Sequence, residues 1–234
     1  KSNSAQHNLD CEEFVEWAVE QGKLHGCETC IFMGDWHHHR ASLSLQTMHH
    51  SLRALEKLSA GFDVTHFITG NHDLYYRDKR DIYSYEWAKH IPNVNIHNEW
   101  FEQDDVILVP WLVGDDHKRI KTASAKFMFG HFELPHFKMN AMVEMPDHGD
   151  INADHFTGYG EVFSGHFHLR QKKNNINYIG NAFPHNFSDA GDNQRGIMIM
   201  EWDGTKEYVA WPDQPLYSVM NLSDVLDYAD QSLK

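Results

Sequence analysis

Hydrophobic and polar positions follow a helical period in two stretches of the first half of the chain. The first helix is predicted to begin at the capping-box-like Asp10-x-x-Glu13, with an inner side formed by Phe14, Val15, Ala18 and Val19. A second helix, ending at Gly61, is predicted from apolar residues at spacings of three and four: Leu45, Met48, Leu52 and Leu55.

Short apolar runs that end in glycine predict buried strands, first over residues 30–33 and 64–68. Their alternation with the helices predicts βαβ units and a parallel sheet. The second half is richer in strands, expected over residues 93–97, 105–111, 126–129, 160–164, 177–179, 196–202 and 207–211, with Asp203-Gly204 as a hairpin turn. The pattern therefore predicts an α/β fold in which helices flank a two-sheet sandwich.

Composition narrows the class of protein. A chain of 234 residues can form one domain, and its 34 acidic against 20 basic residues, a formal charge of −14, argue against a broad basic surface for nucleic acid. The three cysteines form no disulfide framework, which is typical of a reduced, cytoplasmic protein. No apolar run reaches the roughly 18 residues of a membrane span, so no membrane association is expected.

Polar side chains follow several of the predicted strands. In parallel sheets, ligands bind where the carboxyl ends of strands meet. His166 and His168 are two residues apart and are expected to point the same way. A single polar residue or short polar stretch after a strand is more often a turn or a helix cap. Together they predict a metal site formed by a carboxylate, an amide and three imidazoles: Asp35, Asn71, His131, His166 and His168.

This mixed oxygen and nitrogen set suits Mn²⁺, Fe²⁺ or Zn²⁺ better than Ca²⁺ or a structural zinc site. Two such metals, about 3.5–4 Å apart, activate a water and neutralise a phosphoryl group. His72, beside Asn71, is predicted to protonate or stabilise the leaving oxygen, with Asp73 orienting its ring.

The ordered motifs resemble those of the calcineurin-like metallophosphoesterases: Gly34-Asp35, Gly70-Asn71-His72-Asp73, Gly130-His131 and Gly165-His166-Phe167-His168. The resemblance implies a four-layer α/β/β/α sandwich and two divalent metals, with Mn²⁺ favoured over Fe, Zn or Mg. It also implies that Asp35 bridges both metals. Asn71, His131 and His166 would complete the ligands of one metal, and His168 would bind the other.

Within that superfamily the chain is most similar to the SbcD-type nuclease subunits of double-strand-break repair and recombination complexes, including phage-encoded ones. The similarity rests on the stretches 34–38, 109–111, 178–182 and 192–196. It implies a DNA exo/endonuclease, an SMC-like ATPase partner of the SbcC type and a homodimer, in the host cytoplasm if phage-encoded. By resemblance His38 and His72 place the DNA strand and the leaving group, although His37 and His39 compete with His38 for that role.

One departure from the family pattern concerns its D-x-H motif, which should precede Asp35 at the end of a first strand. We expect residues 1–212 to form the nuclease domain without that strand, and residues 213–234 to form a tail with a short helix. Truncation of the sequence is the favoured interpretation; the alternative is a protein that has lost one metal position.

Basic residues near the motifs are the candidate DNA contacts: Arg40, Arg77, Lys79, Arg80, Arg170, Lys172 and Lys173. Two other functions stay open. One is a phosphoesterase acting on a nucleotide or a phosphoprotein, which the acidic composition favours. The other is a catalytically dead scaffold, which only the missing D-x-H supports.

Overall fold

The computed structural model describes residues 4–139, 143–185 and 187–226. Its first half forms a parallel three-stranded sheet in the order β1-β2-β3, flanked by two long helices. The elements are α1 (Ala5–Leu24), β1 (Thr29–Phe32), α2 (Leu45–Gly61), β2 (Val64–Ile68), the short 3-10 helix η1 (Glu86–His90) and β3 (Val94–His97). This half confirms the predicted alternation of helix and parallel strand.

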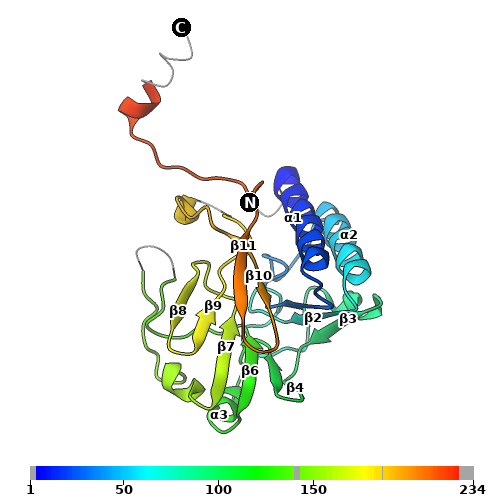
Figure 1. The fold of residues 1–234 in the computed structure, drawn as a ribbon, viewed down its shortest axis with the longest axis vertical. Helices are drawn as coiled ribbons and strands as arrows, with labels where there is room; N and C mark the ends of the chain where they lie inside the picture. The colour runs from blue at the N-terminus through cyan, green and yellow to red at the C-terminus, as the bar shows by residue number, and fades with distance from the viewer. Residues whose placement is uncertain (1–3, 140–142, 186, 227–234) are drawn as a thin grey trace.

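The two long helices pack against each other and against one face of this sheet (Figure 1). Helix α1 begins at Ala5, because the Ser4 side chain caps it by accepting a hydrogen bond from the His7 amide at 3.4 Å. The predicted start at Asp10 is therefore wrong, since that residue lies inside the helix. Val15 and Val19 are buried, as predicted.

The inner face of α2 differs from the predicted stripe. Leu55 is buried as predicted, but Leu45 and Leu52 are 90% and 41% exposed, and the other buried side chains are Ser51, Ala54 and Leu58. The polar Ser51 turns inward because its hydroxyl is hydrogen-bonded to the Trp36 indole at 2.6 Å and to His37 Nε2 at 3.0 Å. Apolar periodicity cannot reveal a face that is anchored by a hydroxyl.

The second sheet has six strands in the order β4-β5-β6-β7-β9-β8. Its strands are β4 (Phe101–Gln103), β5 (Val106–Val109), β6 (Ala125–Gly130), β7 (Tyr159–Ser164), β8 (Gln171–Lys173) and β9 (Ile176–Tyr178). The edge strands β4 and β8 are antiparallel to their neighbours, and the rest are parallel. The sequence predicted neither edge strand; β8 is polar and partly exposed, as edge strands often are.

Alternation along the strands of the second sheet separates two cores. Leu108, Phe129 and Phe163 pack with Met33 and Ile68 of the first sheet. Neighbouring residues on the opposite face, Ile107, Met128 and Val162, form a second core with side chains from α3 (Asp116–Ile120), η2 (Ala153–Phe156) and the connecting loops. The α/β class with mixed sheets is thus confirmed, and short helices and loops cover this outer face.

A hairpin of β10 (Gly196–Met200) and β11 (Lys206–Ala210) follows η3 (Phe187–Asp189). The predicted turn at Asp203-Gly204 is confirmed, and Gly204 has a φ of 104° that favours glycine. Beyond the hairpin the chain leads away from the body to a helical stretch at residues 222–226 (Figure 1). Across the described ranges we find no helix with the length and hydropathy needed to span a bilayer.

Candidate metal centre

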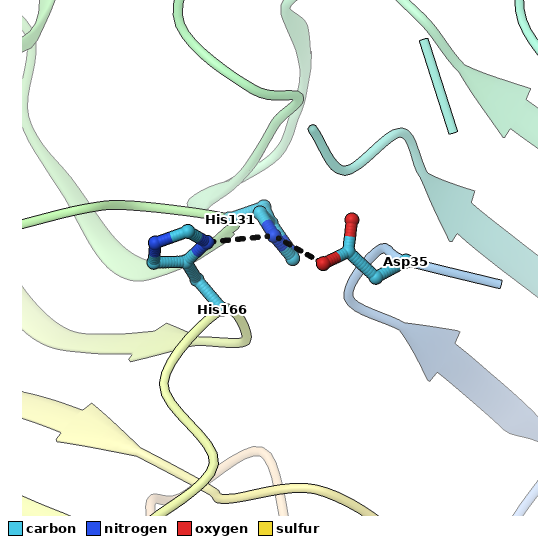
Figure 2. A group of neighbouring side chains, drawn as sticks. All are labelled: Asp35, His131 and His166. Atoms are coloured by element: carbon cyan, nitrogen blue, oxygen red, sulfur yellow. Dashed lines mark hydrogen bonds and ion pairs between the residues drawn. The ribbon is translucent and has the colours of Figure 1, made fainter. Parts of the chain in front are cut away.

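Three strands bring their carboxyl ends to one place. Asp35 follows β1, His131 follows β6 and His166 follows β7, and Figure 2 shows the three side chains turned toward one another. His131 Nε2 is 3.3 Å from Asp35 Oδ2 and 3.3 Å from His166 Nδ1. One ligand atom from each residue lies within 4.8 Å of the others, which is compact enough for a single cation.

Asn71, in the loop after β2, places a fourth candidate ligand atom beside this group. Its Oδ1 is 3.0 Å from His131 Nε2 and 3.2 Å from His166 Nδ1. Four of the five predicted ligands therefore converge.

The outer hydrogen bonds of the two imidazoles determine which nitrogen faces inward. His131 Nδ1 lies 2.7 Å from the Met33 carbonyl oxygen, which can only accept, so this nitrogen carries the proton. His166 Nε2 lies 3.0 Å from Glu133 Oε2 and likewise donates. The lone pairs of both rings therefore point into the space between Asp35 and Asn71. Two lone pairs and two oxygens that converge repel one another unless a cation lies between them, so this donor set fits a divalent metal.

The electrostatics favour an ionised Asp35 but also favour a proton on the inner nitrogen of His131, which a bound cation would have to displace. Burial alone would raise the pKa of Asp35, but His131 and His72 hold the pKa of its carboxyl well below the usual range. Burial opposes charge on His131, yet Asp35 raises the pKa of that ring. Burial lowers the pKa of His166 despite the carboxylate of Glu133. Asp35 is therefore ionised at neutral pH, as a metal-binding carboxylate must be.

The glycines of the motifs permit close approach between segments. A Cβ on Gly70 would lie 2.4 Å from the Asp35 amide nitrogen, and a Cβ on Gly34 would lie 2.4 Å from His131 Nδ1. Asp35 and His166 have φ values of 63° and 77°, in the left-handed region that non-glycine residues rarely adopt. Such strain is often found at functional sites.

His168, the fifth predicted ligand, is not brought into the group that the described residues form around Asp35. Its side chain is 45% exposed, and its Nδ1 lies 3.6 Å from Asp189 Oδ1. β7 ends at Ser164 and His166 has a positive φ, so the strand geometry from which a shared direction of His166 and His168 was expected does not extend to these residues.

A pair of histidines lies beside the centre. The rings of His38 and His72 stack, and His72 Nδ1 lies 2.9 Å from the His38 carbonyl oxygen. That nitrogen therefore carries a proton, which leaves His72 Nε2 for other contacts. The His72 amide donates a 2.8 Å hydrogen bond to Asp35 Oδ1, which links the pair to the metal ligands.

His37 is excluded as the partner of His72. Its side chain is 3% exposed and is held by Ser84 and Ser51 at 2.7 and 3.0 Å. Burial lowers the pKa of His37 to about 4, so the ring is neutral. The His37 side chain therefore anchors the loop that follows β1. The ring that stacks on His72 is that of His38.

Asp73 has a different role from the one predicted. It is fully buried, and its carboxylate accepts hydrogen bonds from the backbone amides of Asp35, Gly70 and His37 at 2.7, 2.9 and 3.0 Å. The prediction that it orients the His72 ring is wrong, because the His38 carbonyl does so. Burial and the charge of Asp35 raise the pKa of Asp73 to about 7.

The candidate DNA contacts divide by exposure. Arg80 is a structural residue: its side chain is 9% exposed and donates to the Trp111 carbonyl and to Asp116 at 2.8 and 2.6 Å. Its donors are thus engaged within the protein, and contact of Arg80 with DNA stays an untested prediction. Arg77 and Lys79 are exposed, and so are Lys172 and Lys173; Arg40 and Arg170 are partly buried, and Arg170 lies over the Tyr208 ring.

Two residues of the site were missed in the sequence. The Trp111 ring lies against the rings of His131 and His166, with centroids 6.1 and 5.3 Å apart. Glu133 contacts His166, as described above. The available signal for Glu133 was general: metal-binding histidines usually donate their other ring N–H to a carboxylate, a carbonyl or water, and Glu133 lies two residues after the predicted ligand His131.

Comparison with known proteins agrees with the motifs. Exonuclease subunit 1 of Enterobacteria phage T4 is 29% identical to this chain over 234 aligned positions, which cover 94% of this chain and 68% of the phage protein. The chain resembles a nuclease subunit of the SbcD type. No protein-family model matches it. The resemblance predicted from the motifs is thereby confirmed with a phage protein that is named as one subunit of an exonuclease.

Proposed function

We propose that this SbcD-like chain is a metal-dependent nuclease that hydrolyses phosphodiester bonds in DNA. The observation that carries the proposal is the convergence of Asp35, Asn71, His131 and His166 at the strand ends. The likeness to a phage exonuclease subunit supports DNA as the substrate.

Asp35, Asn71, His131 and His166 would hold one divalent cation, with Mn²⁺ the first candidate and Fe, Zn or Mg the alternatives. Asp35 would also reach a second cation, to which His168 belongs by resemblance. When bound, these cations supply Lewis-acid stabilisation of the charge that develops on a phosphodiester.

His72 moves the proton in this proposal. Its Nδ1 proton is held by the His38 carbonyl, so Nε2 is the nitrogen available to the leaving oxygen. For His72 to act as a general acid, Nε2 must also be protonated, which makes the ring an imidazolium. The stacked His38 ring limits the rotation of His72 and helps to place the scissile strand.

The organisation of the chain follows the same proposal. Residues 1–212 would form the nuclease domain in the family's four-layer arrangement, with the loops, α3 and η2 as the outer layer. The proposed partner is an SMC-like ATPase of the SbcC type, which would contact the tail at exposed side chains such as Val219 and Leu222, which are 84% and 74% exposed. A homodimer and a cytoplasmic location are also inferred from the resemblance.

One observation favours a second candidate, a phosphoesterase for small substrates or phosphoproteins. The formal charge of −14 disfavours unaided binding to a polyanion. Such an enzyme would use the same ligands without the DNA contacts.

The deciding experiment measures Mn²⁺-dependent hydrolysis of a labelled linear duplex and of bis(p-nitrophenyl) phosphate. The proposal expects duplex cleavage that is lost with EDTA and with His166→Ala. A version extended by its upstream genomic residues tests whether a D-x-H segment completes the second metal position. Hydrolysis of the small ester alone by both versions would support the second candidate. Hydrolysis of neither substrate by either version would indicate a catalytically dead scaffold.

A further inference from the structure

The far side of the His166 ring carries a contact that the proposed mechanism does not use. Glu133 Oε2 lies 3.0 Å from His166 Nε2, while the opposite nitrogen, Nδ1, faces Asn71 and His131. The imidazole therefore lies between Glu133 and the metal position, which excludes this carboxylate as a ligand of the same cation.

We propose that Glu133 is a positioning residue of the metal centre: its carboxylate accepts the Nε2 proton of His166 and fixes the ring with Nδ1 toward the cation. The inference rests on the proposed metal-dependent function and extends it by one residue. A carboxylate that holds a metal-binding histidine in this way typically contributes 10–100-fold to metal affinity.

The backbone around Glu133 is fixed on both sides, as this role requires. The buried Tyr178 hydroxyl donates to the Phe132 carbonyl at 3.0 Å and accepts from the Leu134 amide at 3.3 Å. The Phe132 amide also donates to Ser164 Oγ at 2.9 Å. Phe132 and Leu134 are 1% and 0% exposed, so the residues that flank Glu133 are embedded in the outer core of the second sheet.

The same short segment connects Glu133 to a ligand. His131 and Glu133 are two residues apart and contact His166 on its two sides, since His131 Nε2 is 3.3 Å from His166 Nδ1. A carboxylate with a 35% exposed side chain would otherwise turn to solvent. Its hydrogen bond to His166 therefore depends on the placement of the segment by Tyr178 and Ser164.

The test compares Mn²⁺ binding to the full chain, measured by calorimetry or electron paramagnetic resonance, for the wild type, Glu133→Ala and Glu133→Gln. We expect a 10–100-fold weaker Kd in Glu133→Ala. We expect a smaller loss in Glu133→Gln, because the amide oxygen can still accept the Nε2 proton. The matched control is Glu207→Ala. Glu207 also lies 3.0 Å from a histidine Nε2, but that histidine is His25, which ends helix α1 and is not part of the centre.

A second readout is independent of bound metal. In ¹⁵N-labelled protein the Nε2 proton of His166 should be protected from exchange in the wild type and in Glu133→Gln, and should exchange rapidly in Glu133→Ala. A Kd within about twofold of wild type in a folded Glu133→Ala protein would overturn the inference, as would unchanged protection of this proton. If the wild type binds Mn²⁺ and cleaves no phosphodiester, the proposed function fails while the Glu133 result still decides this inference.

Discussion

The rings of His38 and His72 stack with their centroids 5.1 Å apart and an angle of 13° between their planes. The two residues come from loops after different strands, β1 and β2, and a hydrogen bond between His72 Nδ1 and the His38 carbonyl joins them at 2.9 Å. This contact places one imidazole next to the metal ligands without making it a ligand. The proposed proton transfer and the proposed metal binding are therefore assigned to different side chains.

His72→Ala should abolish turnover and keep the metal. We expect kcat to fall by about 10²–10⁴-fold, because a positioned general acid contributes that much. The Kd for Mn²⁺ should stay within about twofold, since the side chain of His72 is not among the grouped ligands. Single-turnover kinetics on a labelled duplex and calorimetry with Mn²⁺ check both parts. A fully active variant would show that His72 is not the acid.

His166→Ala should lose the metal. The variant removes one of the converging side chains, so the affinity for Mn²⁺ should fall by more than about 100-fold. This exceeds the loss expected when only a hydrogen-bond partner of a ligand is removed. The control is His90→Ala, because His90 is exposed at the end of η1. Equal Mn²⁺ affinity in the two variants would show that Mn²⁺ does not bind at this centre.

Asp73→Asn should loosen the loop that carries the ligands. An amide has a single acceptor oxygen, so at least one of the three backbone amides that Asp73 binds would lose its partner. We expect unfolding to require about 1–3 kcal/mol less free energy. Urea denaturation beside Asp78→Asn, at an exposed position in the following loop, measures the difference.

Glu12→Gln should be destabilising at neutral pH and nearly neutral in acid. Burial opposes ionisation of Glu12, but hydrogen bonds from Arg53, His50 and Lys57 outweigh it and lower the pKa of the carboxyl from 4.5 to about 2. The folded pKa lies below the unfolded one, so this stabilisation is present above about pH 4.5 and is lost as the pH falls toward 2.

The measurement is the free energy of unfolding of wild type and Glu12→Gln from pH 7 to pH 3. We expect a difference of about 1–3 kcal/mol at pH 7 that shrinks on acidification. Glu13→Gln, on the exposed side of the same helix, should show little change at any pH. A constant difference across the range would mean that ionisation of Glu12 does not stabilise the α1–α2 contact.

The strands and the metal motifs were predictable because both are local signals. Residues 64–68 match β2, since an apolar run closed by glycine needs no tertiary information. Asp35, Asn71, His131 and His166 were predictable from their positions after strands, because parallel strands end at one edge of a sheet. The chain by itself therefore determined the α/β class and most of the side chains that converge at the proposed metal centre.

Tertiary structure decided which side chain plays which part. Asp73 binds backbone amides, Arg80 supports the Trp111 loop and Ser51 lies on the buried face of α2, and in each case the partner is distant in sequence. The end of strand geometry at His166, where φ is positive, was likewise not visible in the sequence. Periodicity reports which residues share an element, whereas hydrogen-bond partners and side-chain directions depend on how the elements pack, and only the folded chain fixes that.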